Sequence, residues 1–206
     1  MGESIKRIVS PYQDSYSPNG IIGEKDACGV GFIANIKGIE SNWILKQSLK
    51  GLNCMEHRGG CGGDSDSGDG AGILCSIPWE YLDQEINLQS ELDLNRGLGM
   101  VFMPNTREKI EECKSICDQE AEKLRVKKTS WRTVPVNNAI LGPLAKANAP
   151  FICQWILYID KKDHQDIERL LFQLRKRIEK KIRETFKNHV GDCEFYFASL
   201  SSQTVV

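Results

Sequence analysis

The sequence of 206 residues contains no apolar run approaching the roughly 18 residues that a membrane-spanning helix needs. Its first 27 residues lack both the apolar core of a secretion signal and the Arg- and Ser-rich, acid-poor composition of a transit peptide, so we expect a cytoplasmic protein. Neither sign of charge is in excess, because 27 Lys and Arg stand against 28 Asp and Glu. We therefore expect no nucleic acid and no membrane surface as partner.

Motifs for nucleotide and calcium binding are also missing. There is no Gly-Lys-Ser/Thr phosphate loop, so nothing supports nucleotide binding. Asp64, Asp66 and Asp69 faintly suggest a calcium loop, but the glycine at its sixth position and its closing glutamate are absent when counted from Asp64. We expect no calcium site here.

The chain has eight cysteines and no secretion signal, so most should be buried apolar residues or reactive thiols and not disulfide partners. Four of them fall in helical or strand patterns and are predicted to be core residues: Cys113, Cys117, Cys153 and Cys193. Another set, Cys54, His57 and Cys61 with Cys75, has spacing that could hold zinc, although no second paired-cysteine element follows. A small Cys/His metal-binding protein is therefore one alternative.

Two stretches concentrate the groups that can do chemistry. The first is ACGVGFIA at residues 27–34, where Cys28 stands at the head of an apolar run that favours a strand. The second, at residues 54–72, is rich in glycine and carries one arginine and three aspartates, which predicts an irregular loop. Together they suggest a thiol and a guanidinium that face one small anionic substrate.

Hydrophobic periodicity predicts strands that alternate with amphipathic helices. The expected strands span residues 28–36, 71–77, 97–103, 131–136, 151–159 and 194–200, and another begins at 204–206 with no visible partner. The expected helices span 41–58, 78–86, 106–126 and 163–186, and 143–150 is expected to be a loop. The many basic residues of the last helix alternate with Glu179 and Glu184, which indicates a solvated face. Alternation alone would favour a parallel α/β sheet.

Residues 24–78, read as EKDACGVGFIA, CMEHRGG and DSDSGDGAGIL, resemble the start of the glutaminase domain of glutamate synthase large chains. These domains are class II glutamine amidotransferases and belong to the N-terminal-nucleophile hydrolases. The resemblance implies an α+β fold, the four-layer αββα sandwich with two largely antiparallel sheets, and we prefer it to the parallel sheet. It divides the chain into a leader or propeptide at 1–27 and a partial amidotransferase domain at 28–206.

The resemblance also implies a mechanism that the residues can support. A free thiol with a pKa near ~8.5 needs a base, and the α-amino group of Cys28, with a pKa of about 8, can serve once the bond after Ala27 is cut. Cys28 would attack the side-chain amide of L-glutamine, release ammonia and form a thioester that water cleaves to glutamate. Arg58, with Gly59 and Gly60, would bind the substrate carboxylate, since guanidinium pairs with it bidentately. Alternatively, Arg58 satisfies the last carbonyls of a helix.

One part of the family pattern is missing. The family places an Asn-Gly pair of the oxyanion hole far downstream of the nucleophile, whereas the only Asn-Gly here is Asn19-Gly20. We therefore expect a C-terminally incomplete domain, and a non-catalytic remnant or binding module of the same fold is a second alternative. The FMN and iron–sulfur cluster of the family are implied only for synthase domains outside this chain, which itself is expected to bind no cofactor. The expected partners are L-glutamine and the remainder of a glutamate synthase.

Overall fold

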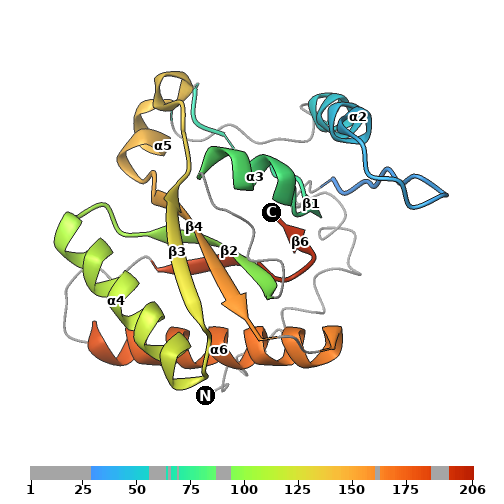
Figure 1. Ribbon diagram of the computed structural model, residues 1–206. Helices are drawn as coiled ribbons and strands as arrows, with labels where there is room; N and C mark the ends of the chain where they lie inside the picture. Colours follow the sequence, from blue (N-terminus) through green and yellow to red (C-terminus); the bar gives the residue numbers. More distant parts are fainter. Residues whose placement is uncertain are drawn as a thin grey trace, which may run out of the picture.

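The computed structural model describes residues 29–55, 64, 66–68, 70–86, 94–160, 163–186 and 195–206 (Figure 1). These residues form a mixed helix and sheet structure. Its centre is a four-stranded sheet of β2 (Asn95–Met103), β3 (Lys128–Thr133), β4 (Phe151–Ile159) and β5 (Tyr196–Ser201) in the order β3-β4-β2-β5. All three ladders are antiparallel. The described sheet is thus antiparallel, as the family resemblance implied, and not the parallel sheet that alternation alone favoured.

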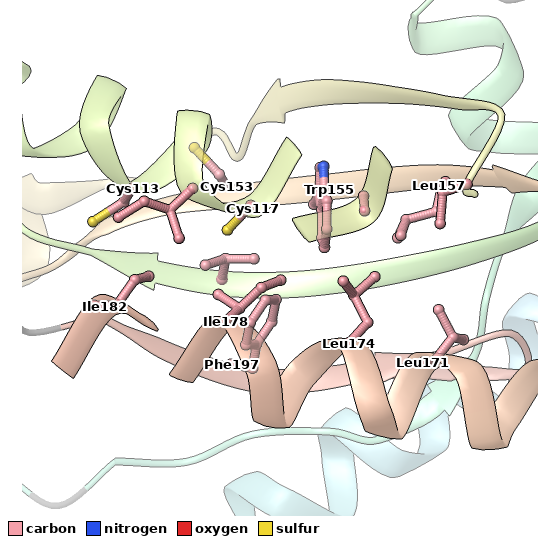
Figure 2. Close-up of a cluster of buried hydrophobic side chains, with 14 of the residues drawn as sticks. Cys113, Cys117, Cys153, Trp155, Leu157, Leu171, Leu174, Ile178, Ile182 and Phe197 are labelled. Carbon is pink, nitrogen blue, oxygen red and sulfur yellow. The ribbon is translucent and has the colours of Figure 1, made fainter. Parts of the chain in front are cut away.

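Two long helices, α4 (Arg107–Lys123) and α6 (His164–Thr185), cover one face of this sheet. Figure 2 shows side chains of α4, β4 and α6 gathered in the resulting core. The apolar residues that recur at helical spacing along the last helix and its C-cap are buried, as expected of an amphipathic helix: Ile167, Leu170, Leu171, Leu174, Ile178, Ile182 and Phe186. Asp163 begins α6 by accepting a hydrogen bond of 2.8 Å from the N–H of Asp166. The hydrophobic cluster on this face is the larger of the two that flank the sheet.

The cysteines predicted to be core residues follow the same pattern. Cys113 and Cys117 of α4 and Cys153 of β4 are buried in the core between the sheet and the helices, whereas Cys193 lies outside the described residues. The basic face of α6 is paired as its composition suggested. Arg175 and Lys176 both contact Glu179, and Arg177 reaches across to Glu120 of α4. These contacts account for much of the basic run without any ligand.

The other face of the sheet is partly covered by shorter elements. They are β1 (Cys75–Ser76), the helix α3 (Trp79–Glu85) and β6 (Thr204–Val205). The core on this side consists of Ile77, Leu82 and Val205 from this layer, Leu98 of β2, and Ile156 and Tyr158 of β4. β6 pairs antiparallel with β1, so that Cys75 lies opposite Val205. The expectation that a strand at 204–206 has no partner is therefore wrong. Its partner is a short strand about 130 residues earlier, a distance that local periodicity does not report.

The predicted strand at 28–36 is also wrong over its described part. Residues 29–35 have no regular structure, and Val30 and Phe32 are 97% and 94% exposed. A strand needs a neighbour to satisfy its backbone, and no described strand pairs with this segment. The apolar side chains alone do not create one.

Several boundaries differ from the predictions as well. The helix α2 (Asn42–Asn53) begins after its cap Ser41 as expected, but it ends before residue 58 and buries no side chain. β3 begins three residues earlier than predicted, and the strand predicted over 71–77 is reduced to the two residues of β1. The expected loop at 143–150 contains the helix α5 (Pro143–Ala147), which follows the short 3-10 helix η3 (Asn138–Ile140).

Candidate active site

The residues predicted to bind and cleave the substrate are Cys28, Arg58, Gly59 and Gly60, and all four lie outside the described residues. His57, Cys61 and Asp69 of the other hypotheses lie outside them too. The structure does describe the chain directly after Cys28 and several positions of the glycine-rich loop that follows Arg58. The candidate site is therefore described from these neighbouring segments.

The segment between the two site motifs is exposed. Ser41 caps α2 with a hydrogen bond of 3.5 Å from the N–H of Ile44, and the helix ends at Cys54, whose N–H bonds to the carbonyls of Leu52 and Lys50. No side chain of α2 is buried, and Trp43 is 64% exposed. This helix therefore leads the chain toward the glycine-rich loop without being fixed by a core of its own.

Two described residues of the glycine-rich loop, Asp64 and Ser67, in contrast contact α5. The carboxylate of Asp64 accepts hydrogen bonds from the N–H of Ser67 at 2.5 Å, from its hydroxyl at 3.0 Å and from the N–H of Leu144 at 2.9 Å. The hydroxyl oxygen of Ser67 in turn accepts from the N–H of Ala145 at 3.0 Å. Two residues of the loop thus hold the first turn of a helix almost eighty positions later in the chain.

The pKa of Asp64 and the close approach at Gly142 both agree with the contact between the loop and α5. The N–H of Leu144, followed by the Ser67 hydroxyl, keeps the pKa of Asp64 below its ordinary value. Gly142, the residue before α5, has no room for a side chain, because a Cβ there would lie 2.5 Å from the Ser67 hydroxyl oxygen and 2.7 Å from the backbone of Asp66. The aspartate that suggested a calcium loop is therefore engaged with α5.

Residue patterns gave only a weak signal for this contact. The order Gly142-Pro143 is typical of a helix start, because proline is favoured at the first helical position, where its missing N–H costs nothing. That signal lay within the stretch expected to be a loop. The residues that complete the helix cap come from a distant segment, so no local pattern could identify them.

The described residues offer no metal site. They contain no group of three or more His, Cys, Asp or Glu side chains that could hold an ion. Of the four ligands considered for zinc only Cys54 and Cys75 are described, and burial, then the charge of Glu40, raises the pKa of the Cys75 thiol. A higher pKa disfavours the thiolate that binds metal. The donors described here likewise do not fit an iron–sulfur cluster, which needs several thiolates together.

The family model of the class II glutamine amidotransferases matches residues 28–206, so the chain belongs to this family. Among curated proteins it is similar to ferredoxin-dependent glutamate synthases. It is 42% identical over 200 residues to the enzyme of Oryza sativa subsp. japonica. The aligned region covers 95% of this chain and 12% of the relative. It is 43% identical over 190 residues to synthase 1 of Arabidopsis thaliana and 40% identical over 190 residues to synthase 2 of Synechocystis. The chain spans about 12% of the length of these relatives.

These matches bear on the other hypotheses. The chain carries a glutamine amidotransferase domain related to glutamate synthases, and nothing in the matches supports a metal-binding protein or a module that has lost its chemistry. Within the described part of the chain, no helix has the length and apolar character to cross a membrane. The rice relative is named as chloroplastic and the Arabidopsis relative as chloroplastic or mitochondrial, so the expected cytoplasmic location is not confirmed.

Proposed function

We propose that this chain is a glutaminase segment of a glutamate synthase, which hydrolyses L-glutamine to glutamate and ammonia. The observation that carries the proposal is the family match, which begins at Cys28 and continues through Val206. Cys28, the first residue of the match, is the nucleophile. The leader at 1–27 is removed, so that Cys28 carries a free amino group. The agreement between the start of the match and the predicted cleavage site supports this boundary.

Cys28 alone supplies both the nucleophile and the base of the proposed reaction. Its α-amino group takes the thiol proton, and the sulfur attacks the carboxamide carbon of glutamine. The C–N bond then breaks, and the proton leaves with ammonia while a glutamyl thioester forms. Water cleaves the thioester, releases glutamate and restores the thiol. Arg58, with Gly59 and Gly60, binds the substrate carboxylate, since a guanidinium offers two parallel donors to it.

We further propose that the chain adopts part of the four-layer αββα sandwich of this family. The helix layer of α4 and α6, the four-stranded antiparallel sheet and the short β1–β6 sheet over its other face support this architecture.

The ammonia would serve the remainder of a glutamate synthase for transfer to 2-oxoglutarate. We retain the cytoplasm as the proposed location, and import of the fluorescently tagged chain into a plastid would overturn it.

Two measurements on the complete chain test the proposed reaction. Intact-mass spectrometry should show loss of residues 1–27, and a diazoketone analogue of L-glutamine should label Cys28. Cys28→Ala should abolish the label, whereas Cys54→Ala, which removes an exposed thiol, should leave it. A chain that keeps its leader, takes no label and releases no glutamate would overturn the proposal in favour of a non-catalytic remnant.

A further inference from the structure

The proposed reaction gives no role to the aspartate and serine of the glycine-rich loop that contact α5. Asp64 and Ser67 bind the N–H groups of Leu144 and Ala145, which lie eighty and seventy-eight positions later in the chain. We propose that Asp64 and Ser67 are positioning residues that fasten the glycine-rich loop to the start of α5. We call this pair, with the two amides it binds, the loop clamp.

The hydrogen bonds at the start of α5 show that the loop clamp completes the helix. The first four N–H groups of a helix have no partner within it and must find one elsewhere. Here Pro143 has no N–H to satisfy, and the next two amides are those that Asp64 and Ser67 accept. The following N–H, that of Lys146, already bonds to the carbonyl of Gly142 at 2.9 Å. The loop therefore supplies both acceptors that the first turn lacks.

Burial and space show that the two segments fit closely. Ser67 is only 7% exposed, so its polar groups are withdrawn from water and depend on the partners described. Gly142 lets the loop approach closely, since a Cβ there would meet both the Ser67 hydroxyl and the loop backbone at less than 3.0 Å. The contact is thus specified by three separated positions, at residues 64, 67 and 142.

The consequence for substrate binding rests on the proposed function. Arg58 precedes Asp64 by six residues, and six residues span at most about 20 Å. Fastening Asp64 to α5 therefore limits where the chain can carry the guanidinium that binds the glutamine carboxylate. Weakening the loop clamp should reduce the affinity for a glutamine analogue while leaving the chemical step at Cys28 unchanged.

Amide hydrogen exchange, measured by NMR on the full chain, tests the loop clamp directly. Asp64→Ala should speed exchange at Leu144, and Ser67→Ala at Ala145, each by about tenfold, the upper limit for one typical hydrogen bond. Gly142→Ala should speed both while leaving every polar side chain in place. Asp66→Ala is the matched control, because Asp66 is exposed in the same motif and its side chain is not part of the contact. Unchanged exchange at Trp155 in the central sheet would show that each variant is folded.

Labelling by the diazoketone analogue then separates the loop clamp from the reaction. In Asp64→Ala the concentration for half-maximal labelling rate should rise severalfold with the maximal rate unchanged, and Asp66→Ala should match the wild type. Equal exchange in Asp64→Ala and wild type, or equal half-maximal concentrations, would overturn the positioning role. A wild type that takes no label but shows the exchange differences would refute the glutaminase proposal and leave the fastening of the loop supported.

Discussion

Asp118 on α4 accepts a hydrogen bond of 3.1 Å from the indole Nε1 of Trp155, a residue of β4 whose side chain is wholly buried. The same carboxylate accepts from the indole of Trp131 and from the hydroxyl of Thr129, both on β3. The two indole rings stack with their centroids 5.3 Å apart. One acid side chain thus joins a helix to two neighbouring strands.

Asp118→Ala should therefore destabilise the protein strongly. It leaves the buried Trp155 indole without its acceptor, and an unsatisfied buried donor costs about 1–3 kcal/mol, so that with the Trp131 and Thr129 bonds we expect about 2–3 kcal/mol. Asp118→Asn keeps an acceptor oxygen and should cost less. Urea unfolding followed by tryptophan fluorescence measures both. Asp160→Ala, which removes an exposed carboxylate paired with Lys127 at 3.2 Å, should change stability by no more than about 1 kcal/mol.

Gly97→Ala tests how closely β2 packs against α6. A Cβ at this position would lie 3.1 Å from both methyl carbons of Leu171, so the added methyl should cost about 1–3 kcal/mol. Leu171→Ala alone should cost about 2–5 kcal/mol because it leaves a cavity. The double variant should lose less stability than the sum of the two single losses, since the new methyl occupies part of that cavity.

The control for this pair is Gly51→Ala on α2. A Cβ there meets nothing within 4 Å, and replacing glycine by alanine in a helix gains up to about 1 kcal/mol. Strictly additive losses for Gly97→Ala and Leu171→Ala in chemical unfolding would contradict the close contact between the two positions.

Stability should depend on pH through Glu120, which is buried on α4. Lys123 first, and then Arg177 of α6, hold its pKa below the ordinary 4.5 of glutamate through hydrogen bonds of 2.6 and 2.8 Å. Because the folded-state pKa is lowered, the carboxylate stabilises the fold fully above the unfolded-state value and ceases to do so as pH falls through the folded-state pKa. Stability should therefore fall on acidification below pH 4.5.

Glu120→Gln isolates that contribution. At neutral pH the variant should be less stable by about 1–2 kcal/mol, because charge-assisted bonds are lost while both partners stay partly solvated. The difference from the wild type should shrink as the pH is lowered, which unfolding curves at several pH values would show. Glu111→Gln is a control, since Glu111 is 64% exposed and pairs with Lys114 only at the surface. An equal difference at every pH would count against the ion pairs.

Thiol labelling should separate the described cysteines by burial. Cys54 is exposed and should react with a maleimide in the folded protein, whereas Cys113 and Cys117 are wholly buried. Burial also raises the pKa of Cys117 well above its ordinary value, which further lowers the amount of reactive thiolate. Peptide mapping by mass spectrometry should find label on Cys117 only after denaturation. Native labelling of Cys117 at the rate of Cys54 would contradict the packing of α4.

Long regular elements were predictable from the sequence. The strand at 151–159 and the helix at 163–186, with one apolar face, agree with the structure, because each repeats one pattern over many residues. The strand prediction for the segment at 29–35 was wrong for a different reason. Its composition favours a strand, but β structure depends on a neighbour, and no local pattern reports whether one is present.

Contacts between distant residues were not predictable. The helix α5 has only five residues and depends on acceptors from Asp64 and Ser67, so it was expected to be a loop. The partner of β6 was missed for the same reason. The site residues Cys28 and Arg58 stay predictions, since they lie outside the described residues and rest on sequence motifs and the family match.

The irregularity in the ladder between β2 and β5 changes which side chains share a face. Phe197 pairs with Val101 and Leu200 with Gly99, and the register skips Ala198. Three positions apart, Phe197 and Leu200 would point to opposite sides of a regular strand, yet both pack toward the helices. Ala198 thus acts as a spacer. Its deletion would leave Phe197 and Leu200 two positions apart, as in a regular strand, and so keep both on the side of the helices. Ser202 would keep its place beside Glu168, which anchors the corner between the two sheets through the Ser202 N–H at 2.7 Å.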